Sequence, residues 1–385
     1  AKLDSLAKVE AEALKAEDLA PVEGQTAVLD TIPDSVRIAQ AQQQYGAFGA
    51  ATIGQEELVT VENDKLVLTV STKGGAIKDV LLKDYFKVLL DTAKQEYKVP
   101  LHLLEDEKNR FEYELPVPSS PNGIVRSSDL YFTPKLEGQT LSLVADLGNG
   151  QSIEQVYSLQ DGRYLLDYDV RFNGLQQVFA NNAQTITLNW VNYLDKLELN
   201  EGYERNYTSI YYKPTDDTSD RCSCTGTDEV EAKQTAIKWV SAANQFFNTT
   251  ILAQDRFSGA VLNTEVLEEE ADDLKKVAAT IQVPYNHSPN ETVSMQLYVG
   301  PNDFERLEAV GYELTDVIPY GRSVFGAINR WIIRPLFNFF DGITGNKGIA
   351  ILLLTLLVKI LVFPLTFKML KSQSKMQAMK PYLEK

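Results

Sequence analysis

A single lysine interrupts an otherwise apolar stretch close to the end of the chain. Gly348–Phe367 is a run of 20 residues in which Lys359 is the one charged side chain. As a helix this run would span roughly 30 Å, the thickness of the hydrocarbon core of a bilayer. Its 14 Leu, Ile, Val and Phe residues, at about −0.3 to −0.6 kcal/mol each, outweigh one lysine at about +2.5 to +3.5 kcal/mol. The run therefore predicts a transmembrane helix with one charge at depth, and such a charge by default marks a functional site.

Two hydroxyl side chains are predicted to share the helical face of Lys359. Thr355 lies four residues before it and Thr366 seven residues after it, spacings that bring side chains to one side of a helix. An ammonium and two hydroxyls in one stripe indicate a wetted substrate groove rather than a lipid-facing surface. Pro364 removes a backbone hydrogen bond, so we expect a helix bend there. The alternative is that Lys359 pairs with an acid on another transmembrane helix and only stabilises assembly.

The charge distribution separates an acidic body from this basic tail. The 385 residues carry a net charge of −16, but from Tyr320 onward 10 Lys and Arg face only two acids, whereas the preceding part has 27 basic and 51 acidic residues. This asymmetry predicts a soluble domain tethered to a membrane and argues against nucleic-acid binding by the large domain. The lysines after Phe367 predict that this end lies in the cytoplasm and the acidic domain outside.

The large domain is predicted to be mainly β. Between residues 56 and 312, short runs of alternating polarity are punctuated by turns; Tyr164–Phe172, for example, follows the turn Gln160–Arg163 and predicts a hairpin. About 250 such residues predict a large antiparallel β-sandwich, closed by a short helix at Asp303–Val310. Similar strand-like runs are Leu66–Thr72, Thr185–Trp190, Thr249–Ala253, Val277–Val283 and Thr292–Val299.

Three further segments flank the sandwich and the apolar run. Residues 1–55 are rich in Ala, Glu, Lys and Gln without sustained periodicity, which predicts a flexible tether. Residues 313–345 hold an amphipathic helix centred on Tyr320–Phe340, which we expect to lie in the membrane interface; the alternative is a helix docked on the sandwich. Residues 346–367 form the predicted transmembrane helix, and 368–385 begin a basic helical segment. The expected interface anchors are Arg330, Trp331 and Arg334.

No residue pattern for covalent chemistry or metal binding is evident. The sequence lacks G-x-S-x-G, P-loop and G-x-G-x-x-G motifs. Its cysteines, Cys222 and Cys224, form either a small disulfide or two free thiols, and its only histidines are His102 and His287. We therefore predict no catalytic residues, no metal and no cofactor.

The order of these segments resembles the bacterial YidC membrane protein insertases. The resemblance covers about residues 57–385. In the tail it is carried by an amphipathic helix, an apolar run with one central cation, and a Lys- and Met-rich stretch. In the large domain the opening strands around Gly74-Gly75 are similar. The segments that carry it are Gly345-Asn-Lys-Gly348, Phe363-Pro-Leu-Thr366, Met379-Lys-Pro381, Glu62–Ile77, Trp239–Phe247 and Leu297–Pro301.

This resemblance implies an insertase that helps new proteins enter the bacterial inner membrane, alone or with the Sec translocon, and that also contacts ribosomes. It implies a periplasmic β-supersandwich similar to sugar mutarotases, with 368–385 opening a cytoplasmic hairpin. Lys359 corresponds to the family's groove cation, usually arginine; lysine there resembles members from the Bacteroidota. The family's other helices are not in this sequence, so we expect a piece of a longer, multi-pass protein that is inactive by itself.

The rival interpretation is a membrane-anchored carbohydrate-binding or aldose-epimerase-like protein. Tyrosines could stack on sugars, and the predicted sandwich resembles epimerases. Epimerases of that class use paired histidines with a carboxylate, whereas His102 and His287 are far apart in sequence. A single-pass scaffold protein is a third possibility.

Overall fold

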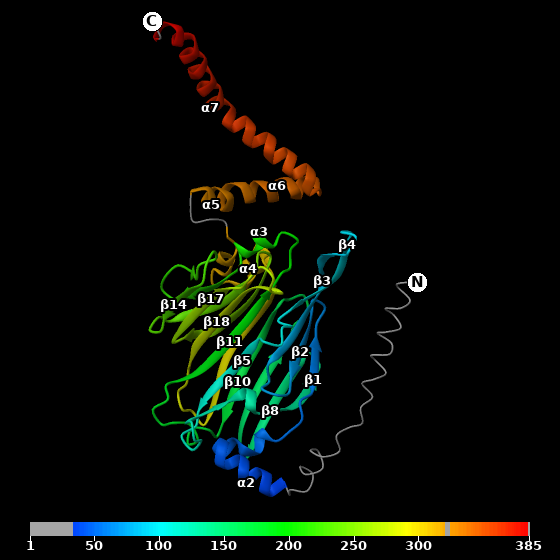
Figure 1. The fold of residues 1–385 in the computed structure, drawn as a ribbon, viewed down its shortest axis with the longest axis vertical. Coiled ribbons are helices and arrows are strands. Elements are labelled where there is room, and N and C mark those ends of the chain that lie inside the picture. Colours follow the sequence, from blue (N-terminus) through cyan, green and yellow to red (C-terminus); the bar gives the residue numbers. More distant parts are fainter. Residues whose placement is uncertain (1–33, 320–323, 384–385) are drawn as a thin grey trace, which may run out of the picture. The chain divides into compact units, whose positions relative to one another are not determined.

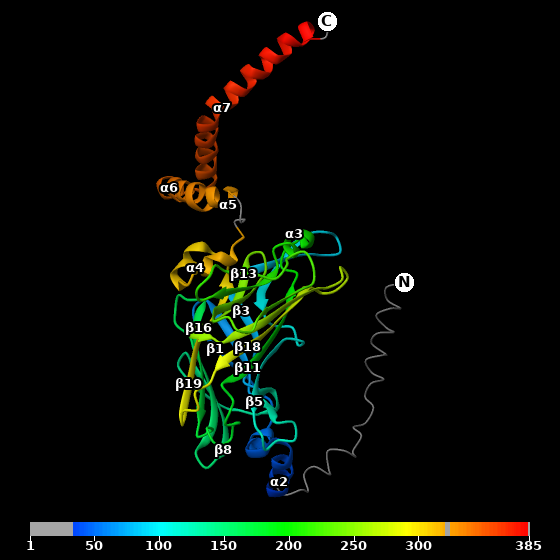
Figure 2. The same ribbon diagram turned by 90° about the vertical axis from the view of Figure 1, so that its left-hand side faces the viewer.

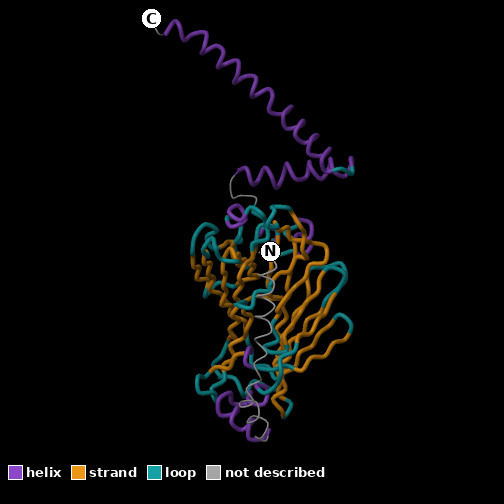
Figure 3. Tube along the Cα trace, turned by 45° about the vertical axis from the view of Figure 1, so that its right-hand side comes forward, coloured by secondary structure: helices purple, strands orange, loops and turns teal. Residues whose placement is uncertain are grey.

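The computed structural model describes residues 34–319 and 324–383 of the chain (Figure 1). A boundary between Val317 and Ile318 divides the chain into two compact units. Strands dominate the first unit, and the described part of the second unit is helical (Figure 3). The predicted class, a mainly β antiparallel sandwich followed by helices, is confirmed.

The strands in the described part of the first unit form three antiparallel sheets. The largest has the order β13 (Asp220–Arg221), β12 (Ser209–Pro214), β15 (Ile237–Ala243), β16 (Phe247–Phe257), β19 (Asn290–Pro301), β10 (Leu165–Asn173), β9 (Gln151–Ser158), β8 (Thr140–Gly148) and β7 (Thr133–Glu137). The second has β14 (Asp228–Ala232), β17 (Gly259–Val266), β18 (Asp273–Pro284), β11 (Thr185–Asp195), β5 (Arg110–Pro116) and β6 (Ile124–Arg126). The third has β1 (Leu58–Glu62), β2 (Leu66–Ser71), β3 (Ile77–Leu90) and β4 (Glu96–Leu103).

The two larger sheets pack face to face through alternating side chains. On β10, Leu166, Tyr168, Val170 and Phe172 are buried and the residues between them are partly exposed, the period of two that a half-buried strand requires. Tyr168 reaches the opposite sheet, where its ring centroid lies 5.8 Å from that of Phe111 on β5. The predicted hairpin is confirmed as β9–β10, and each other strand-like run lies within or overlaps a strand.

A buried hydrogen-bond network joins the sheets near this contact. The Tyr113 hydroxyl donates to the Tyr168 hydroxyl at 3.1 Å, and Tyr168 donates to Gln155 Oε1 at 2.8 Å. Tyr157 donates to the Gly75 carbonyl at 2.7 Å. Gly75 has φ +66°, and a Cβ there would lie 2.3 Å from the Gln155 side chain. Because a buried hydroxyl without a partner costs stability, this network selects one register of the core.

Part of the predicted tether is instead folded against the sandwich. Residues 34–52 form helix α2 (Asp34–Tyr45) and the 3₁₀ segment η2 (Gly46–Thr52). Phe48 is completely buried and stacks on Phe179 with ring centroids 6.3 Å apart. This segment is held by one buried aromatic side chain and by small residues that allow close packing, and it has no extended periodic apolar face. The prediction of a flexible tether is therefore wrong for residues 34–52. The remainder of it, 1–33, lies outside the described residues.

Short helices cap the other end of the first unit, where α3 (Glu201–Arg205) and α4 (Phe304–Val310) lie (Figures 1 and 2). The predicted closing helix is confirmed as α4. It begins after Asp303 because the Asp303 side chain caps it by accepting a hydrogen bond from the Arg306 backbone N–H. The 3₁₀ turns are η3 (Ser127–Asp129) and η4 (Leu314–Val317).

The second unit is built of two helical stretches. The first comprises α5 (Val324–Ile328), a π-helical segment (Asn329–Ile333) and α6 (Arg334–Thr344); the second is α7 (Lys347–Leu383). Gly345, with φ +59°, ends α6 in the left-handed conformation, and the Asn346 side chain then accepts from the backbone N–H groups of Gly348 and Ile349 at 2.9 and 3.2 Å. A C-terminal glycine followed by an N-capping asparagine explains the sharp corner between the two helices.

Candidate functional site

Helix α7 has the length and composition of a membrane-spanning helix. Within the described residues it is the one helix that meets both criteria, over Lys347–Pro364, and only 6% of that window is buried against the rest of the chain. An apolar helix without a covering on its own chain requires lipid or further helices around it. The predicted span therefore stands as a single continuous helix, which runs beyond Phe367 to Leu383.

The three predicted groove residues lie on this helix. Thr355 Oγ1 donates to the Ile351 carbonyl at 2.8 Å, and Thr366 Oγ1 donates to the Val362 carbonyl at 3.1 Å. Each hydroxyl proton is therefore donated to a backbone carbonyl of the same helix. Each hydroxyl oxygen still has lone pairs that can accept a hydrogen bond from another group. Lys359 is exposed and makes no ion pair within the described part of the chain. The stripe offers one ammonium donor and two acceptors; the groove around it stays a prediction.

Pro364 does not end α7. The helix is continuous through it, although proline leaves the carbonyl four residues earlier without its N–H partner. Figure 2 shows α7 changing direction partway along its length. The assignment of this bend to Pro364 stays a prediction.

The helix before α7 presents large apolar side chains outward. Trp331 is 74% exposed, and Ile332, Phe339 and Ile343 are also exposed. Arg330 and Arg334 are one helical turn apart and flank Trp331, which is the combination of aromatic and cationic side chains found at membrane interfaces. Their role as interface anchors stays a prediction.

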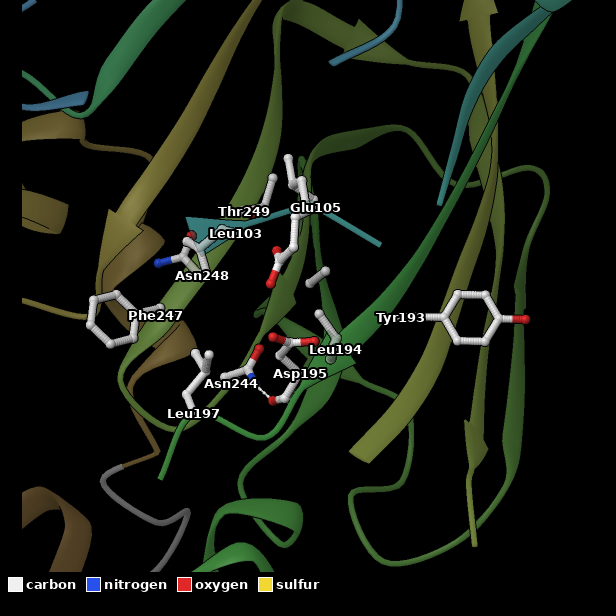
Figure 4. Close-up of a pocket in the computed structure, with 12 residues that line it drawn as sticks. Leu103, Glu105, Tyr193, Leu194, Asp195, Leu197, Asn244, Phe247, Asn248 and Thr249 are labelled. Atoms are coloured by element: carbon white, nitrogen blue, oxygen red, sulfur yellow. Dashed lines mark hydrogen bonds between the residues drawn. The ribbon is translucent and has the colours of Figure 1, made fainter. Parts of the chain in front are cut away.

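A pocket in the β-unit brings together acids that the sequence did not single out (Figure 4). The pocket lies between the ends of β4, β11 and β16 and has a cavity volume of only about 20 Å³. Much of Glu105 is exposed, but its carboxylate points into the pocket toward Asp195 (Figure 4). Desolvation, followed by the hydrogen bond with Asp195 and then the Asp195 charge, raises the pKa of Glu105 to about 8. Lys87 Nζ pairs with Asp195 at 3.3 Å, so this pocket brings two acids together beside one lysine.

The pocket does not provide the histidine pair of the rival interpretation. His102 Nδ1 lies 2.8 Å from Asp79, and His287 Nε2 contacts the Ala183 carbonyl at 2.6 Å. Neither histidine is among the described residues that line the pocket beside Asp195. No group of three or more His, Cys, Asp or Glu side chains suited to a metal occurs among the described residues.

Cys222 and Cys224 are free thiols in the structure, which is the second of the two alternatives predicted for this pair. Cys222 is fully buried, and burial raises its pKa to about 11; Cys224 is partly exposed. Because the thiolate is the reactive form, we expect N-ethylmaleimide to modify Cys224 much faster than Cys222 in the folded protein. Peptide masses after timed labelling measure both rates, with urea-unfolded protein as the control. Equal rates in the folded protein would contradict this burial.

Comparisons with known proteins identify the family. The family described as "YidC periplasmic domain" matches residues 58–339, and "60Kd inner membrane protein" matches 339–385. Membrane protein insertase YidC of Parabacteroides distasonis is 32% identical over 99% of this chain and 60% of its own length. That of Porphyromonas gingivalis is 31% identical over the whole chain and 60% of its own length. The chain thus spans about 60% of these curated relatives, which agree with the predicted Bacteroidota character.

Two solved structures are similar at low scores. A galactose mutarotase-like protein from Lactobacillus casei has TM-score 0.38 and 9% identity and covers 63% of this chain and 100% of its own. An active YidC insertase with its first transmembrane domain resolved has TM-score 0.30 and 14% identity and covers 86% of this chain and 61% of its own. The family assignment rests on the sequence matches, because the first family description alone spans well over half of the chain. The chain belongs to the YidC family.

Proposed function

We propose that this chain is the part of a membrane protein insertase that supplies the groove cation. The observation that carries the proposal is the exposed Lys359 at the centre of a span-length apolar helix, beside two hydroxyl oxygens and without an ion pair in the described part of the chain. A cation at that depth without a partner is costly. It therefore favours transient pairing with acidic or polar stretches of a passing chain.

The proposed mechanism is electrostatic and involves no covalent step, so we infer that the protein is not an enzyme. A polar segment that leaves water for hydrocarbon loses its hydrogen bonds, and pairing with Lys359 in a wetted groove offsets part of that cost. The apolar segment of the substrate then partitions into lipid. Lysine is a point charge whose ionisation depends on hydration more than that of arginine, so the groove must stay wet for Lys359 to act.

The partners and location follow from this role. The substrates are newly made membrane proteins in the bilayer of the bacterial inner membrane, with the Sec translocon and the ribosome as further partners. The full-length protein is multi-pass, with the β-unit in the periplasm and Leu383 on the cytoplasmic side. Support comes from the relatives' name and from the lysines that follow the span.

The groove face is tested by photo-cross-linking from α7 in the full-length protein. A benzoylphenylalanine at Thr355 should cross-link a stalled single-pass substrate. The matched control is Leu361, an exposed residue that lies about 200° around the helix from Lys359. We expect substrate adducts from position 355 and few or none from 361. Equal adducts from both positions would reject a one-sided groove.

The orientation is tested by thiol labelling in spheroplasts. A membrane-impermeant maleimide should label Cys224 in intact spheroplasts, because the β-unit faces outward. Lys371→Cys, in a Cys224→Ser background, should be labelled only after lysis. Labelling of the Lys371→Cys variant before lysis would show the opposite topology.

A further inference from the structure

An exposed apolar hairpin extends from the first unit. Strands β3 and β4 continue together past the other strands of their sheet as a two-stranded ribbon. Phe86 is 56% exposed, Leu90 49% and Tyr97 46%. A two-stranded ribbon with large apolar side chains in water promotes aggregation unless a binding partner covers it.

Both faces of this ribbon carry apolar side chains. The register pairs Phe86 with Pro100 and Leu89 with Tyr97. Because successive side chains of a strand point to opposite faces, Phe86 and Leu90 lie on one face and Leu89 and Tyr97 on the other. An ordinary edge ribbon of a soluble domain keeps one face polar. A medium that contacts both faces at once suits this ribbon better than docking on one side.

The hairpin is held in shape at both ends. At its tip the Asp91 carboxylate accepts from the backbone N–H groups of Ala93 and Gln95, each at 2.8 Å. At its base the Tyr85 ring lies 5.2 Å from that of Phe247, and Lys87 pairs with Asp195. The apolar side chains are therefore presented on a preorganised element, which reduces the entropy lost on binding.

The hairpin points to the end of the domain from which the chain leaves toward the membrane helices. Its tip lies at the same end as α3 and α4 (Figures 1 and 2), and the first unit ends at Val317, directly after α4 and η4. More large apolar side chains are exposed on or beside the elements of this end: Leu199, Tyr203, Phe246 and Tyr312.

The charge of the hairpin also differs from that of its domain. Residues 83–100 contain four lysines and three acids, whereas the chain before Tyr320 has 27 basic and 51 acidic residues. Anionic lipid repels an acidic surface and tolerates a neutral or weakly basic one. Aromatic and aliphatic side chains flanked by lysines are the composition that favours the headgroup region.

We propose that the β3–β4 hairpin dips into the headgroup region of the bilayer and docks the β-unit on the membrane surface. The partner is the lipid surface itself, since lipid can contact the apolar side chains on both faces of the ribbon. The inference rests on the membrane placement proposed above but not on the groove at Lys359.

A fluorescent probe at the hairpin tests the docking. The chain, with Leu90→Cys in a Cys224→Ser background, is labelled with an environment-sensitive dye and reconstituted into vesicles of phosphatidylcholine and phosphatidylglycerol. Buried Cys222 is expected to stay unlabelled. Tyr97→Cys serves as a second probe site on the facing strand. The matched control is Ile124→Cys: Ile124 is 44% exposed and pairs with Pro116, at the end of the β5–β11 ladder away from Asp195.

We expect emission from positions 90 and 97 to shift to shorter wavelength and to be quenched by lipids carrying a nitroxide near the headgroup. Position 124 should show neither change. Lys359→Ala should leave the signal unaltered, so the groove proposal can fail without affecting this one. A water-like, unquenched signal at both hairpin positions would overturn the docking and leave the hairpin as a contact surface for another protein.

Discussion

Replacing Lys359 by alanine in the full-length protein is expected to reduce insertion of single-pass substrates with an acidic translocated segment by about tenfold or more. Moving a charged side chain of the substrate to the bilayer centre costs about 2.5–3.5 kcal/mol. If pairing with Lys359 offsets about half of this cost, its loss is worth near 1.4 kcal/mol, which corresponds to a factor of ten. Lys359→Glu should be more severe because it repels acidic segments. Lys359→Arg should retain activity, since it keeps the positive charge.

The measurement is the protease-protected fraction of a radiolabelled substrate in proteoliposomes. Lys347→Ala is the matched control, because Lys347 is the first residue of α7 and lies outside the apolar core. It should leave insertion near the wild-type level. Unimpaired insertion by both Lys359→Ala and Lys359→Glu would refute the groove cation, and an equal loss in Lys359→Arg would show that more than charge is needed.

Trp239→Ala is expected to have the largest effect on the stability of the β-unit, about 3–5 kcal/mol. Trp239 is the largest of the fully buried side chains, and its indole Nε1 donates to the Tyr312 carbonyl at 2.9 Å. The substitution leaves a cavity and an unpaired carbonyl next to α4. A domain with ordinary stability of about 5–15 kcal/mol would lose a large part of it.

Urea-dependent maleimide labelling of buried Cys222 in the whole chain reports this unfolding. Trp239→Phe should lose less, because it keeps an aromatic ring but not the hydrogen bond, whose net worth is about 0.5–1.5 kcal/mol. Phe246→Ala, at an exposed site, should change stability by no more than about 0.5 kcal/mol. An unfolding midpoint of Trp239→Ala equal to that of Phe246→Ala would show that the Trp239 core contact contributes little.

The elements that could be predicted are those whose signal is local. The alternation of Tyr164–Phe172 and the cap at Asp303 depend on neighbours along the chain, and both are present in the structure. Residues 34–52 were misassigned because their attachment depends on one distant contact, Phe48 on Phe179. A Gln-rich segment has no periodic apolar face that would have indicated it.

The sequence by itself determined the class of the fold, the apolar helix of membrane-spanning length and the spacing of Lys359, Thr355 and Thr366 along it, because each follows from spacing along one strand or helix. Only the tertiary structure decided which distant groups meet. It brought Glu105 beside Asp195, 90 positions later in the sequence. It also set the exposed hairpin at the end of the domain where the first unit ends at Val317. Such contacts arise from sheet pairing between remote segments, and no short-range pattern encodes which strands become neighbours.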